Sequence, residues 1–346
     1  MTEFNFLPMD RVVYGKKSIN TLNGHIERLG KRKALIVTGS SVSKGKFFSS
    51  ICNIIGIDYV VFSDVTQHSP IEEIEHAIES FRNNGCDIII SVGGGSVIDS
   101  SKMIRHYYDV KVPQIAIPTT LSASEFSHIA GYTIDSEKNG VRDKAITPTM
   151  VIIDPDAAKE TPDRLWRSTG IRSLDHAIET IFSNGESEIA RIMALGAIEK
   201  LFKNLMGKSD ENRLECFMAA WYSYFEVYDS KMGLSHNIGK VIGSKWEIPH
   251  GITSCMTLPL AMKYYSKYKV KETSEIKQVL AGTPYGNTEP WIAVSKFIEN
   301  LGLASKPLDY SLTKNDIPYI MEKLKDKPDW AEEMLTELLS MENQVP

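Results

Sequence analysis

The chain has 346 residues, of which 42% are hydrophobic, enough apolar material for one large core or two ordinary ones. Its formal net charge of -5 comes from interspersed acidic and basic residues, and the lack of a basic stripe excludes nucleic acid as an expected partner. We find no apolar stretch approaching the roughly 20 residues of a membrane span and no signal-peptide pattern, so we expect no membrane association. Four widely spaced cysteines are typical of reduced thiols, which favours the cytoplasm and a small-molecule partner.

The first half of the chain alternates short apolar runs with helical patterns. The clearest helical pattern begins at Ser69, where Ser69, Pro70 and Glu72 predict a capping box and Gly85 predicts a C-terminal cap. Such alternation predicts a Rossmann-like, doubly wound parallel sheet, an α/β fold. The predicted strands, continuous apolar runs buried on both faces of the sheet, are residues 34–38, 59–62, 87–92, 114–117 and 150–153.

The strand signals vanish from about residue 161 onward. Helical periodicity over 188–206, 214–228 and 290–301 predicts an all-helical second half. We therefore expect two domains, a dinucleotide-binding α/β domain over 1–160 and a helical domain over 161–346.

A glycine-rich turn, Gly93-Gly94-Gly95-Ser96, follows one predicted strand and precedes a helix. Backbone N–H groups at a helix N-terminus attract phosphate, and glycines let a pyrophosphate approach closely. Thr119 follows the next strand and Thr120 comes directly after it, so their hydroxyls are expected at the carboxyl edge, where open α/β sheets bind ligands. The pattern predicts a dinucleotide site, with a purely structural turn and capping threonines as the alternatives.

The choice of cofactor depends on the residues that follow strand 34–38. Here Gly39 and Ser40 lead into Ser43 and Lys44, and no carboxylate is present to bind a ribose 2′-hydroxyl. Backbone N–H groups, hydroxyls and one lysine make a plausible nest for a 2′-phosphate, so we expect NADP, with NAD as the alternative. The alternative for Lys44 is a solvated turn.

Four motifs in order resemble the iron-containing alcohol dehydrogenase superfamily over about residues 11–310. They are the glycine turn with Asp99 and Lys102, then 118–120, 170–179 (GIRSLDHAIE) and 233–251 (GLSHNIGKVIGSKWEIPHG). The loop 119–125 is one residue shorter than in typical alcohol dehydrogenases, which makes the maleylacetate reductase-like branch the most similar.

The resemblance implies a Rossmann-like N-terminal domain and an all-helical C-terminal domain, an architecture shared with 3-dehydroquinate synthase. It also implies an active site in the cleft between the domains and a homodimer. From the residue patterns and the resemblance together, we expect the cofactor to be bound by Gly93, Gly94, Gly95, Ser96, Asp99, Thr119, Thr120, Ser122, Gly39 and Ser40.

The family's metal site uses an aspartate and a histidine four residues apart on one helix, and two further histidines. The three histidine positions hold His176, His236 and His250. The aspartate position holds Arg172, and a cation beside a divalent metal costs Coulomb energy. We expect Asp175 not to replace the aspartate, because adjacent helix positions point about 100° apart and Asp175 should not share the face of Arg172 and His176. Another position that often holds histidine near the nicotinamide has Lys240.

Two chemical interpretations of this cluster, and one purely structural one, remain. In the favoured one there is no metal: Arg172 and Lys240 hold a substrate carboxylate and polarise a carbonyl, while one of the histidines donates the proton. In the other, the three histidines bind Zn²⁺ or Fe²⁺. A third, purely structural possibility is that Arg172 and Asp175 form an ordinary surface ion pair.

We therefore expect an oxidoreductase that transfers a hydride between NAD(P)H and a small, acidic carbonyl or alcohol compound, resembling maleylacetate reductase. One alternative is a metal-dependent alcohol dehydrogenase with a three-histidine site. Alternatives of other classes are a 3-dehydroquinate synthase-like lyase and a cofactor-binding protein that has lost catalysis.

Overall fold

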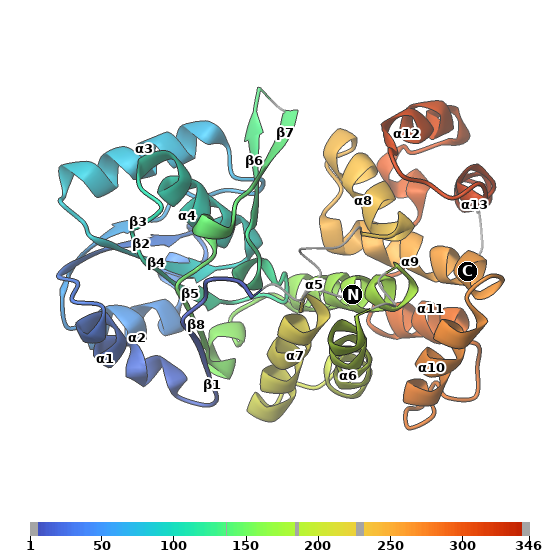
Figure 1. Cartoon of the computed structure of the whole chain (residues 1–346), viewed down its shortest axis with the longest axis horizontal. Coiled ribbons are helices and arrows are strands. Elements are labelled where there is room, and N and C mark those ends of the chain that lie inside the picture. The colour runs from blue at the N-terminus through green and yellow to red at the C-terminus, as the bar shows by residue number, and fades with distance from the viewer. Residues whose placement is uncertain (1–5, 136, 184–186, 226–231, 341–346) are drawn as a thin grey trace. The chain divides into compact units, whose positions relative to one another are not determined.

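A computed structural model describes residues 6–135, 137–183, 187–225 and 232–340. The chain divides into two compact units (Figure 1). Among the described residues, the α/β unit contains 6–162 together with Ser209–Phe217, and the helical unit contains Asp163–Lys208 together with the residues from Met218 onward.

A six-stranded, all-parallel sheet forms the α/β unit, in the order β1-β8-β5-β4-β2-β3. Its strands are β1 (Arg11–Tyr14), β2 (Lys33–Thr38), β3 (Asp58–Phe62), β4 (Ile88–Gly93), β5 (Gln114–Pro118) and β8 (Met150–Ile153). The parallel doubly wound sheet and all five predicted strands are confirmed. The pattern missed β1, a four-residue edge strand that is only partly buried and so lacks a continuous apolar run.

Helices cover both faces of this sheet, α1 and α2 on one face and α3 and α4 on the other (Figure 1). Their bounds are α1 (Leu22–Arg28), α2 (Lys46–Ile54), α3 (Ile71–Asn83) and α4 (Gly95–Tyr108). Successive residues of a strand point to opposite faces, so Ile36 packs with α1 and α2 while Val37 packs with α3 and α4. The two cores fix the carboxyl edge of the sheet, where the glycine turn lies.

The predicted capping box at Ser69 is wrong. Ser69 has a left-handed backbone (φ 51°), and α3 begins only at Ile71, with no capping side chain in the described structure. The Ser69 hydroxyl instead donates to the carbonyl of Ser96, 3.0 Å away. Gly85 is confirmed as the C-terminal cap, since its φ is 64° and the next N–H, of Cys86, bonds the Phe81 carbonyl at 3.0 Å.

An antiparallel hairpin, β6 (Ile129–Ile134) and β7 (Glu137–Arg142), follows β5 and packs against α4. The sequence pattern did not reveal it, because Gly131 and Gly140 face each other in the ladder and few of its residues are buried. Short 3₁₀ turns complete the α/β unit: Ser18–Thr21, Val42–Lys44, Ser124–Phe126, Lys144–Ile146 and Pro155–Ala158.

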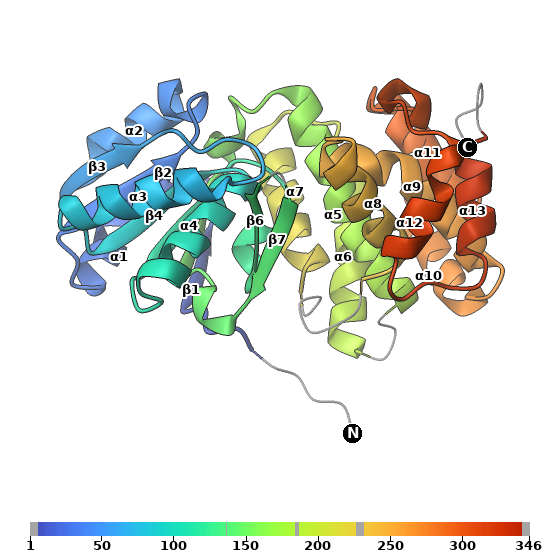
Figure 2. The same ribbon diagram turned by 90° about the horizontal axis from the view of Figure 1, so that it is seen from above.

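Helices alone make up the described helical unit (Figure 2). They are α5 (Asp163–Ser183), α6 (Glu188–Asn204), the end of α7 (Asp210–Ser223), α8 (Leu234–Lys245), α9 (His250–Ser266), α10 (Val270–Leu280), α11 (Pro290–Asn300), α12 (Ile317–Lys323) and α13 (Ala331–Leu338), with 3₁₀ turns at Pro307–Tyr310 and Lys314–Asp316. The nearly fully buried α9 contacts α5, α8, α11 and α13, which makes it the centre of the unit.

The three predicted helical segments correspond to α6, α7 and α11. Helix α7 begins four residues earlier than predicted and ends at Ser223. Residues 226–228 of the predicted segment lie outside the described residues. None of the helices that the structure describes is long and apolar enough to cross a membrane.

Candidate functional site

The glycine turn lies at the point where the strand order reverses. From β2 the chain moves outward to β3, returns to β4 on the other side of β2, and continues to β5 and β8. In open α/β sheets the crevice at the carboxyl ends of such a pair is where ligands bind. The carboxyl ends of β2 and β4 carry Gly39 and Gly94, so both predicted cofactor segments border the same crevice.

Close packing explains why the turn consists of glycines. A Cβ on Gly93 would lie 2.7 Å from a Val97 methyl, and one on Gly94 would lie 3.0 Å from Thr120. A Cβ on Gly95 would lie 3.2 Å from Ser122. The turn therefore lies directly against the loop that carries the predicted hydroxyl groups.

The N-terminus of α4 retains donors for an anion. Gly94 caps this 14-residue helix and supplies no side-chain cap, and Ile98 is the first residue whose N–H bonds back into the turn, to the Gly94 carbonyl at 3.2 Å. The Thr120 hydroxyl beside the turn is buried and has no hydrogen-bond partner among the described residues. A pyrophosphate would satisfy these donors, so the residues fit the dinucleotide that the sequence predicts.

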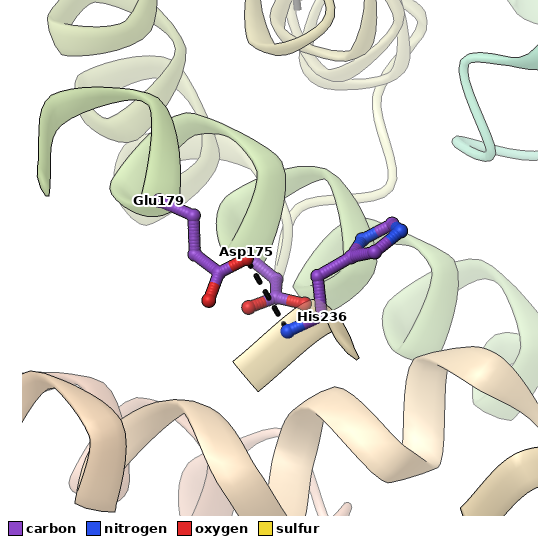
Figure 3. Close-up of side chains that lie close together, drawn as sticks. All are labelled: Asp175, Glu179 and His236. Atoms are coloured by element: carbon purple, nitrogen blue, oxygen red, sulfur yellow. Dashed lines mark hydrogen bonds between the residues drawn. The ribbon is translucent and has the colours of Figure 1, made fainter. Parts of the chain in front are cut away.

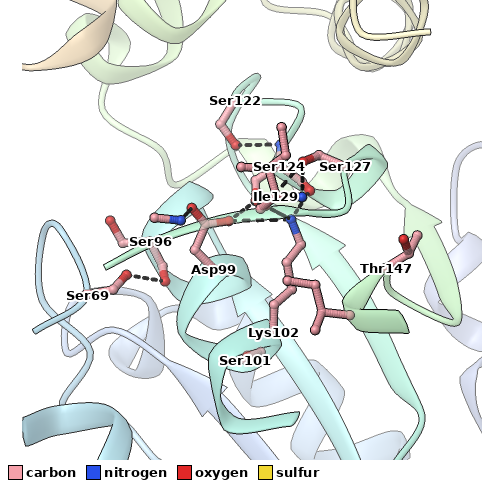
Figure 4. Close-up of polar contacts among 12 residues, drawn as sticks. Ser69, Ser96, Asp99, Ser101, Lys102, Ser122, Ser124, Ser127, Ile129 and Thr147 are labelled. Carbon is pink, nitrogen blue, oxygen red and sulfur yellow. Dashed lines mark hydrogen bonds and ion pairs between the residues drawn. The ribbon is translucent and has the colours of Figure 1, made fainter. Parts of the chain in front are cut away.

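Asp99 and Lys102 hold the neighbouring loop in place (Figure 4). The Lys102 side chain is fully buried, and its ammonium donates to the carbonyls of Ser124 and Ile129 at 2.6 and 2.8 Å. Asp99 accepts from the Ser124 hydroxyl and from the N–H of Gly131. Burial lowers the pKa of Lys102, and the nearby Asp99 opposes that shift. Both residues thus have structural partners, whereas a direct cofactor contact by Asp99 stays a prediction.

The turn after β2 meets the end of β3. A Cβ on Gly39 would lie 3.2 Å from the Val65 carbonyl, and the exposed Asp64 directly precedes Val65. Ser43 folds back onto the turn, since its N–H bonds the Gly39 carbonyl and its hydroxyl bonds the Ser40 carbonyl, both at 3.0 Å. Asp64 therefore belongs to the segment that packs against the Gly39 turn. Sequence reasoning missed it because only the pairing of β2 with β3 brings it there.

Four polar side chains line one face of α5 in the helical unit: Arg172, Asp175, His176 and Glu179, each at most 7% exposed. Their spacing of three and four residues puts them on neighbouring turns. The expectation that Asp175 could not share the face of Arg172 is wrong, because positions three apart are in contact even though adjacent positions diverge. The resulting ion pair is also buried rather than superficial.

The Arg172 guanidinium is bonded on two sides. One terminal nitrogen donates to Asp175 Oδ2 and to the Ser254 hydroxyl, both at 3.1 Å, and the other lies 3.2 Å from His236 Nε2. Ser254 in turn donates to Asp175 Oδ2 at 2.7 Å. Gly239 of α8 makes room, since a Cβ there would lie 2.7 Å from the Thr253 hydroxyl of α9 and 3.7 Å from the guanidinium.

Glu179 fixes the start of α8 (Figure 3). The backbone N–H of His236 donates to Glu179 Oε2 at 3.2 Å. Burial raises the pKa of the Glu179 carboxyl well above its ordinary value and also raises that of Asp175, where Arg172 opposes the shift. Asp175 is the carboxylate that pairs with Arg172, and Ser254 donates to the same oxygen.

The predicted histidines and Lys240 gather around this cluster. Burial, reinforced by the charge of Arg172, holds the pKa of His176 and His236 well below the ordinary value, so both imidazoles are neutral. Their ring centroids are 5.4 Å apart. The half-buried His250 begins α9, and the exposed Lys240 lies one turn after His236. Electrostatic interaction with Lys240 and His250 further lowers the pKa of His176 and of His236, which places all five predicted residues in one region.

The fit of a metal ion can be tested on these contacts. Ligand atoms of Asp175, Glu179 and His236 lie within 4.8 Å of one another, and they form the one such group found among the described residues. The guanidinium of Arg172 already bonds two of the three residues, so a divalent cation would sit beside a full positive charge. The residues present therefore do not fit the family's metal. Sequence reasoning did not assign a role to Glu179, although this residue ends the motif 170–179, and it missed Ser254, which lies in none of the quoted motifs.

A dinucleotide crevice in one unit, and in the other a buried arginine with two buried histidines, a half-buried histidine and an exposed lysine, are the features of a nicotinamide-dependent oxidoreductase. The model of the iron-containing alcohol dehydrogenase family matches residues 9–155, and that of the Fe-containing alcohol dehydrogenase C-terminal family matches residues 167–327. The chain belongs to the iron-containing alcohol dehydrogenase family, as predicted.

A maleylacetate reductase of Rhizobium sp. is 27% identical to this chain, over 86% of this chain and 87% of the relative. An NAD-dependent methanol dehydrogenase of Bacillus methanolicus is 25% identical, over 92% of this chain and 91% of the relative. The crystal structure of a Rhizobium maleylacetate reductase superposes with a TM-score of 0.85 at 25% identity, covering 96% of this chain and 95% of that one. A 1,3-propanediol oxidoreductase shares the fold, with a TM-score of 0.88 at 21% identity over 97% of this chain and all of that one. The chain is thus an NAD(P)-dependent oxidoreductase that resembles the maleylacetate reductases.

Proposed function

We propose that the chain reduces a small, acidic carbonyl compound, an oxo acid, with a hydride from NAD(P)H, and oxidises the corresponding alcohol in reverse. The α/β unit binds the cofactor, and the helical unit supplies the groups that act on the substrate. The relatives named maleylacetate reductase support an oxo-acid substrate.

One observation carries this proposal: two cations, Arg172 and Lys240, lie in the same region as three histidines. A cationic environment favours an anionic substrate and stabilises the negative charge that develops on a carbonyl oxygen as hydride arrives. Both terminal nitrogens of Arg172 already bind protein groups, so clamping a carboxylate between them would break existing bonds. We therefore assign the substrate carboxylate to the exposed Lys240 and leave Arg172 as a fixed positive charge.

In this proposal a histidine donates the proton to the carbonyl oxygen of the substrate. His236, His176 and His250 are the candidates, and the half-buried His250 can exchange protons with solvent most readily.

For the cofactor, we propose NADP, supported by the hydroxyls and Lys44 of the turn after β2. Asp64 lies near this turn and can bind a ribose 2′-hydroxyl, so we expect NADH to be used as well. We also propose a cytoplasmic homodimer. All four cysteines are unpaired, which supports a reducing compartment.

The decisive experiment assays chelator-treated protein for NADPH and NADH oxidation with oxo acids, neutral aldehydes and sugar phosphates, alongside elemental analysis. Activity with oxo acids that survives chelation supports the proposal. Activity that chelation abolishes and Zn²⁺ or Fe²⁺ restores would indicate a metal-dependent alcohol dehydrogenase. Cyclisation of a phosphorylated sugar acid without net NADH consumption would indicate a lyase. Lys240→Met should raise KM for an acidic substrate and leave KM for a neutral aldehyde unchanged.

A further inference from the structure

The buried donor group in the helical unit has the composition of a divalent metal site. Two carboxyl groups and one neutral imidazole, of Asp175, Glu179 and His236, have ligand atoms within 4.8 Å of one another. Ligands about 2.0–2.6 Å from one divalent ion lie at most about 5.2 Å apart, so a single ion could reach all three. Asp175 Oδ1 and Glu179 Oε1 are moreover buried and have no hydrogen-bond partner in the described part of the chain.

The guanidinium cation of Arg172 already contacts this donor group. The Arg172 guanidinium donates to Asp175 Oδ2 and lies 3.2 Å from His236 Nε2. A neutral imidazole nitrogen next to a guanidinium must accept, because guanidinium has donors only. The bond to His236 uses the one lone pair that Nε2 could offer to a metal, and the bond to Asp175 places a full positive charge against the same carboxylate.

The charges of these side chains also disfavour a bound metal ion. Arg172 keeps its charge in proteins, and its planar fork suits a carboxylate on one side and an imidazole nitrogen on the other. The ion pair of Arg172 with Asp175 balances the charge of the guanidinium without any added ion. A divalent cation would bring two further positive charges into a region where every side chain named is at most 7% exposed.

We infer that Arg172 is a built-in cation that takes the place of a divalent metal among Asp175, Glu179 and His236 and closes this donor group to metal. The inference concerns which cation the fold accommodates, so it does not rest on the proposed reaction. It implies that a single substitution at position 172 opens the site.

The test measures metal binding by the whole chain with Co²⁺, whose visible absorption reports its coordination. Arg172→Asp removes the cation and adds a carboxylate four residues before His176, on the same helix face. Arg172→Lys keeps a positive charge and serves as the matched control. Equilibrium dialysis gives the stoichiometry, and thermal unfolding with and without Co²⁺ gives an independent measure, because a ligand that binds only the folded state raises Tm.

Wild type and Arg172→Lys should show no Co²⁺ absorption band and no change in Tm. Arg172→Asp should bind about one Co²⁺ per chain, with a raised Tm, and adding His236→Ala should abolish both effects. Adding His76→Ala, at an exposed histidine of α3, should leave them intact. If Arg172→Asp folds only when Co²⁺ is present, that dependence also supports the inference.

Arg172→Met keeps the inference testable without an added carboxylate. It should show a Co²⁺-dependent rise in Tm that wild type lacks. The inference is overturned if wild type takes up Co²⁺ and His236→Ala abolishes that uptake. It is equally overturned if both Arg172→Asp and Arg172→Met fold and bind no more Co²⁺ than wild type. Because no arm measures turnover, failure here would leave the proposed reductase activity untouched.

Discussion

Replacing Asp175 by asparagine should lower the free energy of unfolding of the helical unit by about 3–5 kcal/mol, the range for breaking a buried ion pair. Asp175 Oδ2 accepts from Arg172 at 3.1 Å and from Ser254 at 2.7 Å. Hydrogen bonds to a charged group contribute about 1.5–3 kcal/mol each, so losing the charge weakens two such bonds. The substitution also leaves the buried guanidinium without its counter-ion.

Tryptophan fluorescence in urea measures this loss selectively, because all five tryptophans belong to the helical unit. They are Trp166, Trp221, Trp246, Trp291 and Trp330. The matched control is Asp163→Asn on the same helix, whose exposed carboxylate pairs with Lys208. That change should cost less than about 1 kcal/mol.

A double variant that removes both charges tests whether the loss comes from the unpaired guanidinium. Replacing both partners by apolar residues, Arg172→Met with Asp175→Leu, should recover most of the stability that Asp175→Asn loses, because no unpaired charge remains. The reasoning is refuted if Asp175→Asn costs no more than Asp163→Asn.

Three further predictions concern the α/β unit. Burial raises the pKa of Glu125 to about 7 from an ordinary 4.5, so the folded state holds this proton and stability should fall as the pH rises from 4.5 to 7. Glu125→Gln should make the free energy of unfolding less dependent on pH, by about 3 kcal/mol between pH 4.5 and 7. Urea unfolding followed by circular dichroism at several pH values measures this. Parallel pH curves for the variant and the wild type would contradict the prediction. Arg105→Met should lower the free energy of unfolding by more than about 4 kcal/mol, because the buried guanidinium donates to five backbone carbonyls. The control Arg32→Met, at an exposed position, should lower it by less than about 0.5 kcal/mol. Similar losses for the two variants would show that the Arg105 bonds contribute little. Gly94→Ala should weaken NADPH binding at least about tenfold in calorimetry, because its Cβ would meet Thr120 at 3.0 Å, and an unchanged Kd would argue against pyrophosphate binding at this turn.

The sequence predicted the central sheet well because strands buried on both faces are continuous apolar runs. β4 is the clearest case, with every residue from Ile88 to Gly93 buried. The edge strand β1 and the hairpin of β6 and β7 escaped the same pattern, because residues on an edge or in a two-stranded ribbon face solvent and need not be apolar. Ser69 shows a further limit, since its serine-proline pattern suits a helix cap but its hydroxyl bonds Ser96 instead.

The candidate site shows a similar division. Motif spacing identified Arg172 and the three histidines, and the structure places them in one region. Motif spacing could not reveal that both terminal nitrogens of Arg172 contact protein groups, because Ser254 is 82 residues away and only the packing of α9 on α5 brings it there. Asp64 was missed for the same kind of reason, since the register of β2 and β3 determines its position.

The account rests on direct hydride transfer from the cofactor to an acidic carbonyl compound without a metal. The most direct test gives chelator-treated protein NADPH carrying deuterium at C4 of the nicotinamide, in each of its two stereochemical forms, with the most active oxo acid of the panel. We predict that one form alone passes its deuterium to the carbinol carbon of the product, as mass spectrometry would show. Deuterium that stays on the cofactor or is lost to solvent would contradict the account, as would a transfer that stops on chelation and resumes when a divalent metal is restored.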